Sequence, residues 1–426
     1  MTVATSRSAD VAVIGGGIVG VATALQLQRS GRNVVVIERG IPGNEASGHN
    51  GGMFSGDCMP VGTPGVIRSL PTMLRDPESA LVLRKRYIPR LAPWLIRFAL
   101  ASRASRVESI SIALNSLMSR GFDAFRPLVA GTAAEDVLTQ RAYLYGYRDR
   151  KVLDSESYAF GLRKRRGVAY EIVDPAWIAN LDPLLAGRFE VGAYFPDAFW
   201  TKDPRAFTQT LLDDVVARGG AVRRAEVRSF ARSNGSNGRV ERIVTDDGEV
   251  SAGAVVIAAG PWSRALLRQL GTDVPLDVER GYGADLPDPG IHLQTPVVMN
   301  DFHISMTPHR TGVRITGIDE LASIAAPADL RIAQRLLRSA KKVFPELRTD
   351  GAELWMRRRP SMPDSLPVIG RAPKSENTWL AFGHAHKGVC MAAITGEIVR
   401  QLMDGQPTTV DVEPFRPTRF SWSATL

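Results

Sequence analysis

The sequence predicts an α/β fold in which a parallel sheet is assembled from separated segments, with a second domain inserted between them. Three observations support this prediction. An apolar strand near residues 11–14 leads into a glycine-rich turn and an Ala- and Leu-rich helix. A second apolar strand runs into a glycine turn at 254–262, and a strand, a glycine loop and a helix follow one another at 378–404. Apolar runs of this kind are typical of parallel strands that are buried on both faces.

The first turn has the glycine spacing of a dinucleotide-binding site. Gly15 allows a sharp turn, Gly17 lets the backbone approach a pyrophosphate, and Gly20 allows close packing of helix and strand. The N-terminus of the helix offers free N–H groups to phosphates. The next apolar strand, residues 34–37, ends at Glu38, whose carboxylate is placed to accept hydrogen bonds from ribose hydroxyls. These elements predict a Rossmann-type binding unit; a glycine-rich turn of an ordinary α/β domain is the alternative.

The middle of the chain contains loop, helix and strand signals in turn. Residues 43–56 are small, polar and rich in glycine, so their backbone can approach a flat ligand without side-chain clashes. Apolar spacing predicts helices from about 66 to 125, and short strands and turns are expected at 140–200. Asp203 followed by proline marks the start of a helix, which we expect to end at Gly219.

The second half of the chain returns to strands. Alternating apolar residues predict strands at 221–230 and 239–245, antiparallel strands over 280–355 with a helix near 328–343, and a final strand at 378–382. The loop 383–388 then leads into a last helix. Because no low-complexity linker separates these parts, the parallel sheet must be built from distant segments of one chain.

Length and composition exclude several classes of protein. A chain of 426 residues with 44% hydrophobic residues is expected to form two globular domains. Cys58 and Cys390 are the two cysteines, too few for a disulfide framework, which is typical of a reducing compartment. The first ten residues have no apolar region like that of a secretory signal, and no apolar stretch is long enough to span a bilayer. We therefore expect a cytoplasmic protein.

The net charge of +9 comes from scattered lysines and arginines. Zinc-finger spacing, RNP-like aromatic motifs and a long basic tail are absent from the sequence, so nucleic acid is not an expected partner. The arginine-rich helix expected around residues 94–106 has two interpretations. It packs on the inserted domain, or it contacts an anionic membrane surface on the inner face of the cell membrane.

Four blocks of sequence carry a resemblance to a known family: the fingerprint with Glu38, the loop 46–52, the turn 258–262, and residues 359–370 with 383–388. Through them the chain resembles the D-amino-acid oxidase-like FAD-dependent oxidoreductase superfamily, and is most similar to its bacterial D-amino-acid dehydrogenases. The resemblance implies noncovalent FAD in a Rossmann-type domain (residues 1–65, 201–270 and 360–426). It also implies an α+β substrate-binding domain with a mixed, largely antiparallel sheet (residues 66–200 and 271–359).

The resemblance also implies positions for the cofactor contacts. It places the pyrophosphate against Gly15, Gly17, Ile18 and Val19, the ribose against Glu38 and Arg39, the flavin along Ser47, Asn50, Gly51 and Gly52, and adenine at Val227. The remaining expected contacts are Ala259, Gly260, Trp262, Gly370, Gly383, His386, Lys387, Gly388 and Val389. The last helix directs N–H groups at the flavin pyrimidine edge, where negative charge develops on reduction. Lys387 has two interpretations, a flavin contact or a solvent-exposed side chain.

Amine oxidation by a flavin requires a clamp for the substrate carboxylate. Arg359 is the candidate, because a guanidinium binds a carboxylate in a planar, bidentate way; a structural ion pair is the alternative. Tyr282, and Tyr143 or Tyr145, are candidates for a supporting phenol, and His49 and His303 are candidates for the pocket border. His384 and His386 alternate without a third ligand motif, so no metal is expected.

We therefore expect FAD-dependent oxidation of a D-amino acid, with D-proline-type imino acids among the candidates. Hydride passes from Cα to flavin N5, the imino acid hydrolyses to the 2-oxo acid, and the electrons pass to a quinone or an electron-transfer protein. One alternative is a sarcosine- or glycine-type secondary-amine oxidase that uses oxygen. The other is a flavoprotein electron-relay subunit within a hetero-oligomer.

Overall fold

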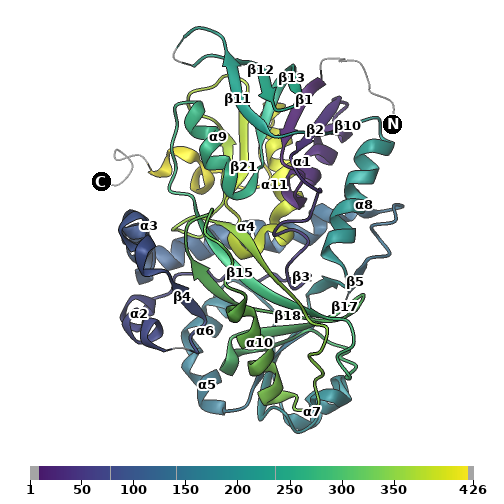
Figure 1. Ribbon diagram of the computed structural model, residues 1–426, viewed down its shortest axis with the longest axis vertical. Coiled ribbons are helices and arrows are strands. Elements are labelled where there is room, and N and C mark those ends of the chain that lie inside the picture. Colours follow the sequence, from purple (N-terminus) through teal and green to yellow (C-terminus); the bar gives the residue numbers. More distant parts are fainter. Residues whose placement is uncertain (1–8, 77, 141, 236, 421–426) are drawn as a thin grey trace.

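The computed structural model describes residues 9–76, 78–140, 142–235 and 237–420. A parallel sheet with its helices occupies one half of the molecule, and a larger mixed sheet occupies the other half (Figure 1). The predicted α/β architecture is confirmed.

Segments far apart in the sequence build the parallel sheet. Its strand order is β10 (Ala221–Arg224), β2 (Val34–Glu38), β1 (Ala9–Ile14), β14 (Ala252–Ile257), β21 (Thr378–Phe382) and β20 (Val368–Arg371). Only the pair of β20 with β21 is antiparallel among these neighbours. The three observations that predicted the fold therefore describe neighbouring strands of one sheet.

Both faces of this sheet are covered, which explains its continuous apolar sequences. Val11 and Val13 of β1 face a core shared with α1 (Ile18–Arg29), α4 (Ala104–Val129), α8 (Pro204–Ala217) and α11 (Gly388–Met403). Ala12 and Ile14 face the other core, which contains α9 (Ser263–Gln269) and the antiparallel strands β11 (Val227–Arg232), β12 (Val240–Thr245) and β13 (Gly248–Val250). The start of α8 is as predicted, because the Asp203 carboxylate accepts a hydrogen bond from the backbone N–H of Ala206.

The larger sheet carries the second half of the molecule. Its order is β19 (Glu353–Ser361), β15 (Asp277–Leu286), β18 (Gly312–Leu321), β17 (Ile304–His309), β16 (Val297–Met299), β6 (Tyr143–Tyr147), β8 (Val191–Phe195) and β7 (Glu171–Val173), with β4 (Leu81–Leu83) beside β18. Most pairs are antiparallel, while β16 with β6 and β4 with β18 are parallel. Helix α10 (Leu330–Val343) packs on one face of this sheet (Figure 1).

Shorter elements lie outside these two sheets. They are the small sheet of β3 (Met53–Phe54), β9 (Phe199–Thr201) and β5 (Leu138–Gln140), and the helices α2 (Val66–Arg75), α3 (Ile88–Ala101), α5 (Arg150–Ser155), α6 (Ser157–Arg165) and α7 (Pro175–Leu181). Helix α4, whose residues we expected in the substrate-binding domain, packs against α1 and α11. Within the described ranges, no helix is both long and apolar enough to cross a membrane.

Candidate active site

A cavity of about 380 Å³ opens at the carboxyl ends of the parallel strands. Its wall includes Ile14 at the end of β1, Glu38 at the end of β2, and Phe382 at the end of β21. It extends to Arg359 on β19 and to His386 in the 383–388 loop. Ligands of open α/β sheets bind at this edge, so the cavity is the candidate site.

The dinucleotide end of the cavity has the features that the glycine spacing predicts. Gly15 has a φ of +117°, and a Cβ there would overlap the carbonyl oxygen of Ala258. The Glu38 carboxylate accepts hydrogen bonds from the backbone N–H groups of Gly16 and Gly40, each at 2.8 Å. These two bonds fix the carboxylate at the cavity wall, where it can accept hydrogen bonds from the hydroxyl groups of a ribose.

The N-terminus of α1 faces the same cavity. The hydroxyl of Ser47 accepts a hydrogen bond from the backbone N–H of Ile18 at 2.9 Å. Other N–H groups of the first turn remain free to bind a phosphate. The Arg39 guanidinium lies 3.7 Å from the ring centroid of Trp262, and both residues line the wall. A backbone cradle, a fixed carboxylate and a helix N-terminus therefore fit the ADP portion of FAD.

Most of the expected cofactor contacts line the cavity. They are Gly15, Gly17, Ile18, Val19, Glu38, Arg39, Ser47, Asn50, Val227, Ala259, Gly260, Trp262, His386, Gly388 and Val389. The expected contacts Gly51, Gly52, Gly370, Gly383 and Lys387 are not part of the wall. The Gly52 N–H is bonded to the Asn50 side chain, and Gly370 lies within β20.

Arg359 reaches the cavity because of the register of three strands. It lies opposite Glu279 in the β15–β19 pair, and Asp319 of β18 lies opposite Gly281. The Arg359 guanidinium passes over Gly281, where a Cβ would overlap it, and its Nη1 forms an ion pair with Asp319. Among the described residues, Nε and Nη2 have no hydrogen-bond partner, so these donors remain available to a ligand.

A strained backbone turns Asp319 toward Arg359. Strand β18 has one more residue than β15 at this point, because Gly281 pairs with Asp319 while Tyr282 pairs with Gly317. The extra residue, Ile318, has a φ of +44°, which is unusual for a β-branched side chain. Bulges and strained residues of this kind concentrate next to functional sites.

Lys387 belongs to a second group of charges, on the side of the loop away from the cavity. Its Nζ donates to the Asp57 carbonyl at 2.8 Å and lies 3.8 Å from the Asp57 carboxylate. Arg163 of α6 forms an ion pair with the same carboxylate at 3.3 Å. Burial opposes the Asp57 charge, yet the two cations lower the pKa of Asp57 to about 2. We call Asp57, Arg163 and Lys387 the sealed cluster.

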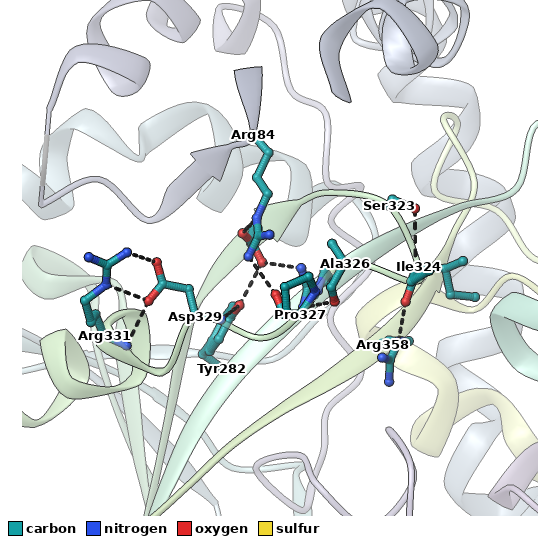
Figure 2. Close-up of polar contacts among 12 residues, drawn as sticks. Arg84, Tyr282, Ser323, Ile324, Ala326, Pro327, Asp329, Arg331 and Arg358 are labelled. Atoms are coloured by element: carbon teal, nitrogen blue, oxygen red, sulfur yellow. Dashed lines mark hydrogen bonds and ion pairs between the residues drawn. The ribbon is translucent and has the colours of Figure 1, made fainter. Parts of the chain in front are cut away.

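The candidate tyrosines do not line the cavity. Tyr282 is fully buried beneath α10; its hydroxyl donates to Glu320 at 2.7 Å and accepts the N–H of Asp329 (Figure 2). Tyr143 and Tyr145 of β6 lie beside the sealed cluster, with the Tyr145 ring centroid 5.6 Å from the Arg163 guanidinium carbon. Tyr282 is therefore not part of the cavity wall. Glu279 of the same strand contacts His386, which lines the cavity.

The two candidate border histidines differ in position. His49 lines the cavity, and its Nε2 accepts a hydrogen bond from Arg357 at 2.9 Å. Burial, with the charges of Arg357 and Arg314, lowers the pKa of His49 to about 4, so this ring is neutral at pH 7. His303 is exposed at the turn between β16 and β17, outside the wall.

Sequence reasoning missed several residues of the site. Glu279 and Asp319 lie outside the cavity wall but contact its lining residues His386 and Arg359, and Arg358 lines the cavity while donating to the Ile324 carbonyl at 2.9 Å (Figure 2). Side chains alternate between the two faces of a strand, so Glu279 and Tyr282 lie on opposite faces. This alternation is the sequence signal that could have indicated Glu279 in place of Tyr282. The position of Asp319 depends on the bulge, for which the sequence offers no signal.

Comparisons with known proteins agree with this geometry. The family model described as FAD dependent oxidoreductase, named DAO, matches residues 10–402. A D-amino-acid oxidase of Bradyrhizobium diazoefficiens is 31% identical over 418 residues, which cover 96% of this chain and 98% of that protein. A D-amino acid dehydrogenase of Methylobacterium nodulans is 31% identical over 421 residues, which cover 96% and 99%.

A solved structure shares the whole fold. Glycine oxidase of Geobacillus kaustophilus superposes with a TM-score of 0.70 at 22% identity, covering 97% of this chain and 99% of that one. The fingerprint end of the cavity, the matched family model and the full-length relatives agree on the cofactor class and the reaction class. The chain therefore belongs to the DAO family of FAD-dependent oxidoreductases.

Proposed function

We propose that this enzyme binds FAD noncovalently and oxidises a D-amino acid, or a D-proline-type imino acid, to the imino acid, which hydrolyses to the 2-oxo acid. The observation that supports this most is a single cavity with a dinucleotide cradle at one end and the unsatisfied donors of Arg359 at the other. The curated relatives, a D-amino-acid oxidase and a D-amino acid dehydrogenase, support the D configuration.

The chain's own residues supply binding and orientation in this reaction. FAD, when bound, supplies the hydride acceptor. Gly15, Glu38 and the first turn of α1 hold its ADP portion, and Arg359 holds the substrate carboxylate so that Cα lies against the acceptor. The amine must lose a proton before its Cα hydrogen leaves with two electrons. His49 is neutral at pH 7 and can contact an ammonium group without repelling it.

Noncovalent binding is supported by the positions of the two cysteines. Cys58 and Cys390 are both buried and lie outside the cavity wall. Burial raises the pKa of the Cys58 thiol to about 11, so it is a poor nucleophile at pH 7. We also propose that the domain division expected from the sequence applies, with α4 packing on α1 and α11 while its Glu108 forms ion pairs with Arg165 and Arg166 of the other part.

The electron acceptor is proposed to be a quinone or an electron-transfer protein. Helix α3 buries Leu91, Trp94 and Phe98 but exposes Ile88, Ile96 and Leu100 beside exposed arginines at 90, 103 and 106. An apolar and basic surface of this kind supports peripheral contact with an anionic membrane. The second candidate is a glycine- or sarcosine-type oxidase that uses oxygen, which the shared fold with glycine oxidase favours.

A panel of D- and L-amino acids, glycine and sarcosine tests these proposals. Turnover is measured with a dye acceptor and, separately, with oxygen, for the wild type and Arg359→Lys. We expect D-amino acids to be oxidised with the dye, and KM to rise at least tenfold in the variant because lysine cannot bind a carboxylate in a bidentate way. Turnover of glycine or sarcosine alone, with oxygen, contradicts the proposal, and an unchanged KM contradicts the role of Arg359.

A further inference from the structure

His386 connects the glycine loop to two carboxylates on the large sheet. Its Nε2 lies 3.1 Å from the Glu279 carboxylate and 3.3 Å from the Asp319 carboxylate. The isolated bridge between His384 and Ser361 holds the loop against the end of β19, beside Arg359. We call Glu279, Asp319, Arg359 and His386 the cavity cluster.

The backbone on both sides of this contact is strained. Ala385, which precedes His386, has a φ of +46°, and Ile318, which precedes Asp319, has a φ of +44°. Left-handed backbone is unfavourable in non-glycine residues and persists where the surroundings impose it. Ala385 in the loop and Ile318 in β18 therefore bring the His386 imidazole and the Asp319 carboxylate together from two different elements.

The charges of the cavity cluster determine which ligand it accepts. Glu279 and Asp319 contribute two negative charges and Arg359 contributes one positive charge, so the cluster has a net charge of −1 when His386 is neutral. Protonation of His386 makes the cluster neutral. A carboxylate ligand is repelled in the first state and can bind Arg359 in the second.

The surroundings of His386 favour the protonated state. Burial and the Arg359 charge oppose protonation, but Asp319 and Glu279 raise the pKa of His386 to about 9. Arg358 and the neutral His49 also line this part of the cavity, while Lys387 is bonded to Asp57. The His386 side chain is 34% exposed, and no described residue bonds its Nδ1, which is therefore available as a second N–H donor.

We propose that Glu279 and Asp319 are positioning residues that hold His386 as an imidazolium, and that His386 and Arg359 together bind the substrate carboxylate. This inference rests on the proposed function, because it concerns the same substrate group. Glu279 and Asp319 then act through His386 and not by touching the substrate. Binding of the amino acid depends on the proton that His386 carries.

The test uses propionate, a carboxylate without an amino group, so that only the protein titrates. Binding to the FAD-loaded protein is followed by calorimetry and by perturbation of the flavin absorbance from pH 6 to 10.5. We expect the wild-type affinity to fall as the pH rises through about 9, and to level off about tenfold lower, when His386 is neutral. In Glu279→Gln, which leaves the ion pair of Arg359 with Asp319 intact, the fall begins at lower pH. In His386→Gln, binding at pH 7 is about tenfold weaker and independent of pH, the equivalent of one charge-assisted hydrogen bond.

Asp273→Asn is the matched control, because Asp273 is also a carboxylate between two cations, Arg264 and Arg268, but lies outside the cavity wall. Its propionate profile should equal that of the wild type. Titration of the His386 ring by NMR, assigned by its loss in His386→Gln, gives a readout that requires no ligand. A resonance that titrates near 9 in the wild type and lower in Glu279→Gln supports the inference.

Three outcomes overturn the inference. The first is propionate binding by His386→Gln at pH 7 as tight as that of the wild type, and the second is an unchanged pH profile of propionate binding in Glu279→Gln. The third is a stoichiometric divalent metal ion bound by Glu279, Asp319 and His386. The ligand atoms of these three residues lie within 4.8 Å of one another, and a metal-bound imidazole is neutral. Failure of the proposed function is distinguishable. If the wild type oxidises no amino acid while His386 still titrates near 9, the substrate assignment fails and the charge assignment stands.

Discussion

His386 and Lys387 are neighbours in the chain, yet their side chains enter two charge clusters of different character. The sealed cluster has one carboxylate between two cations, and its side chains are 6%, 12% and 16% exposed for Arg163, Asp57 and Lys387. In the cavity cluster, Glu279 and Arg359 are 7% and 19% exposed and Asp319 and His386 are 30% and 34% exposed, and Arg359 and His386 line the cavity.

Access to the cavity separates two uses of the same kinds of side chain. Removing a buried partner leaves uncompensated charge, so the sealed cluster must act mainly on stability. It ties the 383–388 loop to the segment after β3 and to α6. The cavity cluster keeps unsatisfied donors at the wall and must act mainly on ligand binding. Variants in each cluster should therefore affect different measurements.

The largest expected effect is on stability, from Asp57→Ala. Two cations lose their buried counterion, and we expect the free energy of unfolding to fall by about 3–5 kcal/mol in urea denaturation. Asp273→Asn removes an exposed carboxylate with two arginine partners and should cost at most about 1 kcal/mol. Equal losses of unfolding free energy in Asp57→Ala and Asp273→Asn would show that the buried carboxylate is no more important for stability than the exposed one.

The next effect is on binding, from Gly281→Ala. The new Cβ overlaps the Arg359 guanidinium, whose flexible side chain must move away from Asp319. We expect KM for the best substrate to rise about tenfold, equivalent to about 1.4 kcal/mol, with a smaller change in unfolding free energy. Because both changes act on one contact, Gly281→Ala combined with Arg359→Lys should be no worse than Arg359→Lys alone. Additive losses would place Arg359 elsewhere.

The smallest effect is the pH dependence of stability. The pKa of His386 is raised from 6.5 to about 9, so its contribution is complete below pH 6.5 and is lost as the pH rises through 9. Since this side chain is partly exposed, we expect a loss of about 1 kcal/mol of unfolding free energy over this range, absent in His386→Gln. The pKa of Asp57 is lowered to about 2, so the contribution of the sealed cluster is lost at the acid end, below pH 4. Loss of unfolding free energy in one shared pH range would contradict the assignment of the alkaline loss to His386 and of the acid loss to Asp57.

Local patterns predicted the dinucleotide end of the site. Gly15, Gly17, Gly20 and Glu38 act through a turn, a helix and a strand that are continuous in sequence, so their spacing determines their positions. The parallel sheet was predictable for the same reason, because strands buried on both faces are apolar throughout.

The charged end of the site depends on contacts between distant strands. Arg359 was predicted to face the substrate and does line the cavity, but its partner Asp319 is set by strand register and by the bulge at Ile318. The same register places Tyr282 in the core beneath α10. Propensity and spacing contain no information on register, so they favour Tyr282 as a site residue and give no signal for Asp319.

The most direct test of the account is anaerobic mixing of the FAD-loaded wild type with a D-amino acid, its L enantiomer and the amide of the D enantiomer, followed by flavin absorbance. We expect rapid loss of the oxidised flavin band with the D-amino acid and at least tenfold slower loss with the amide, which lacks the charge that Arg359 and His386 bind. The L enantiomer should leave the band unchanged. Equal rates of reduction by the acid and its amide would contradict the carboxylate site on which the account depends.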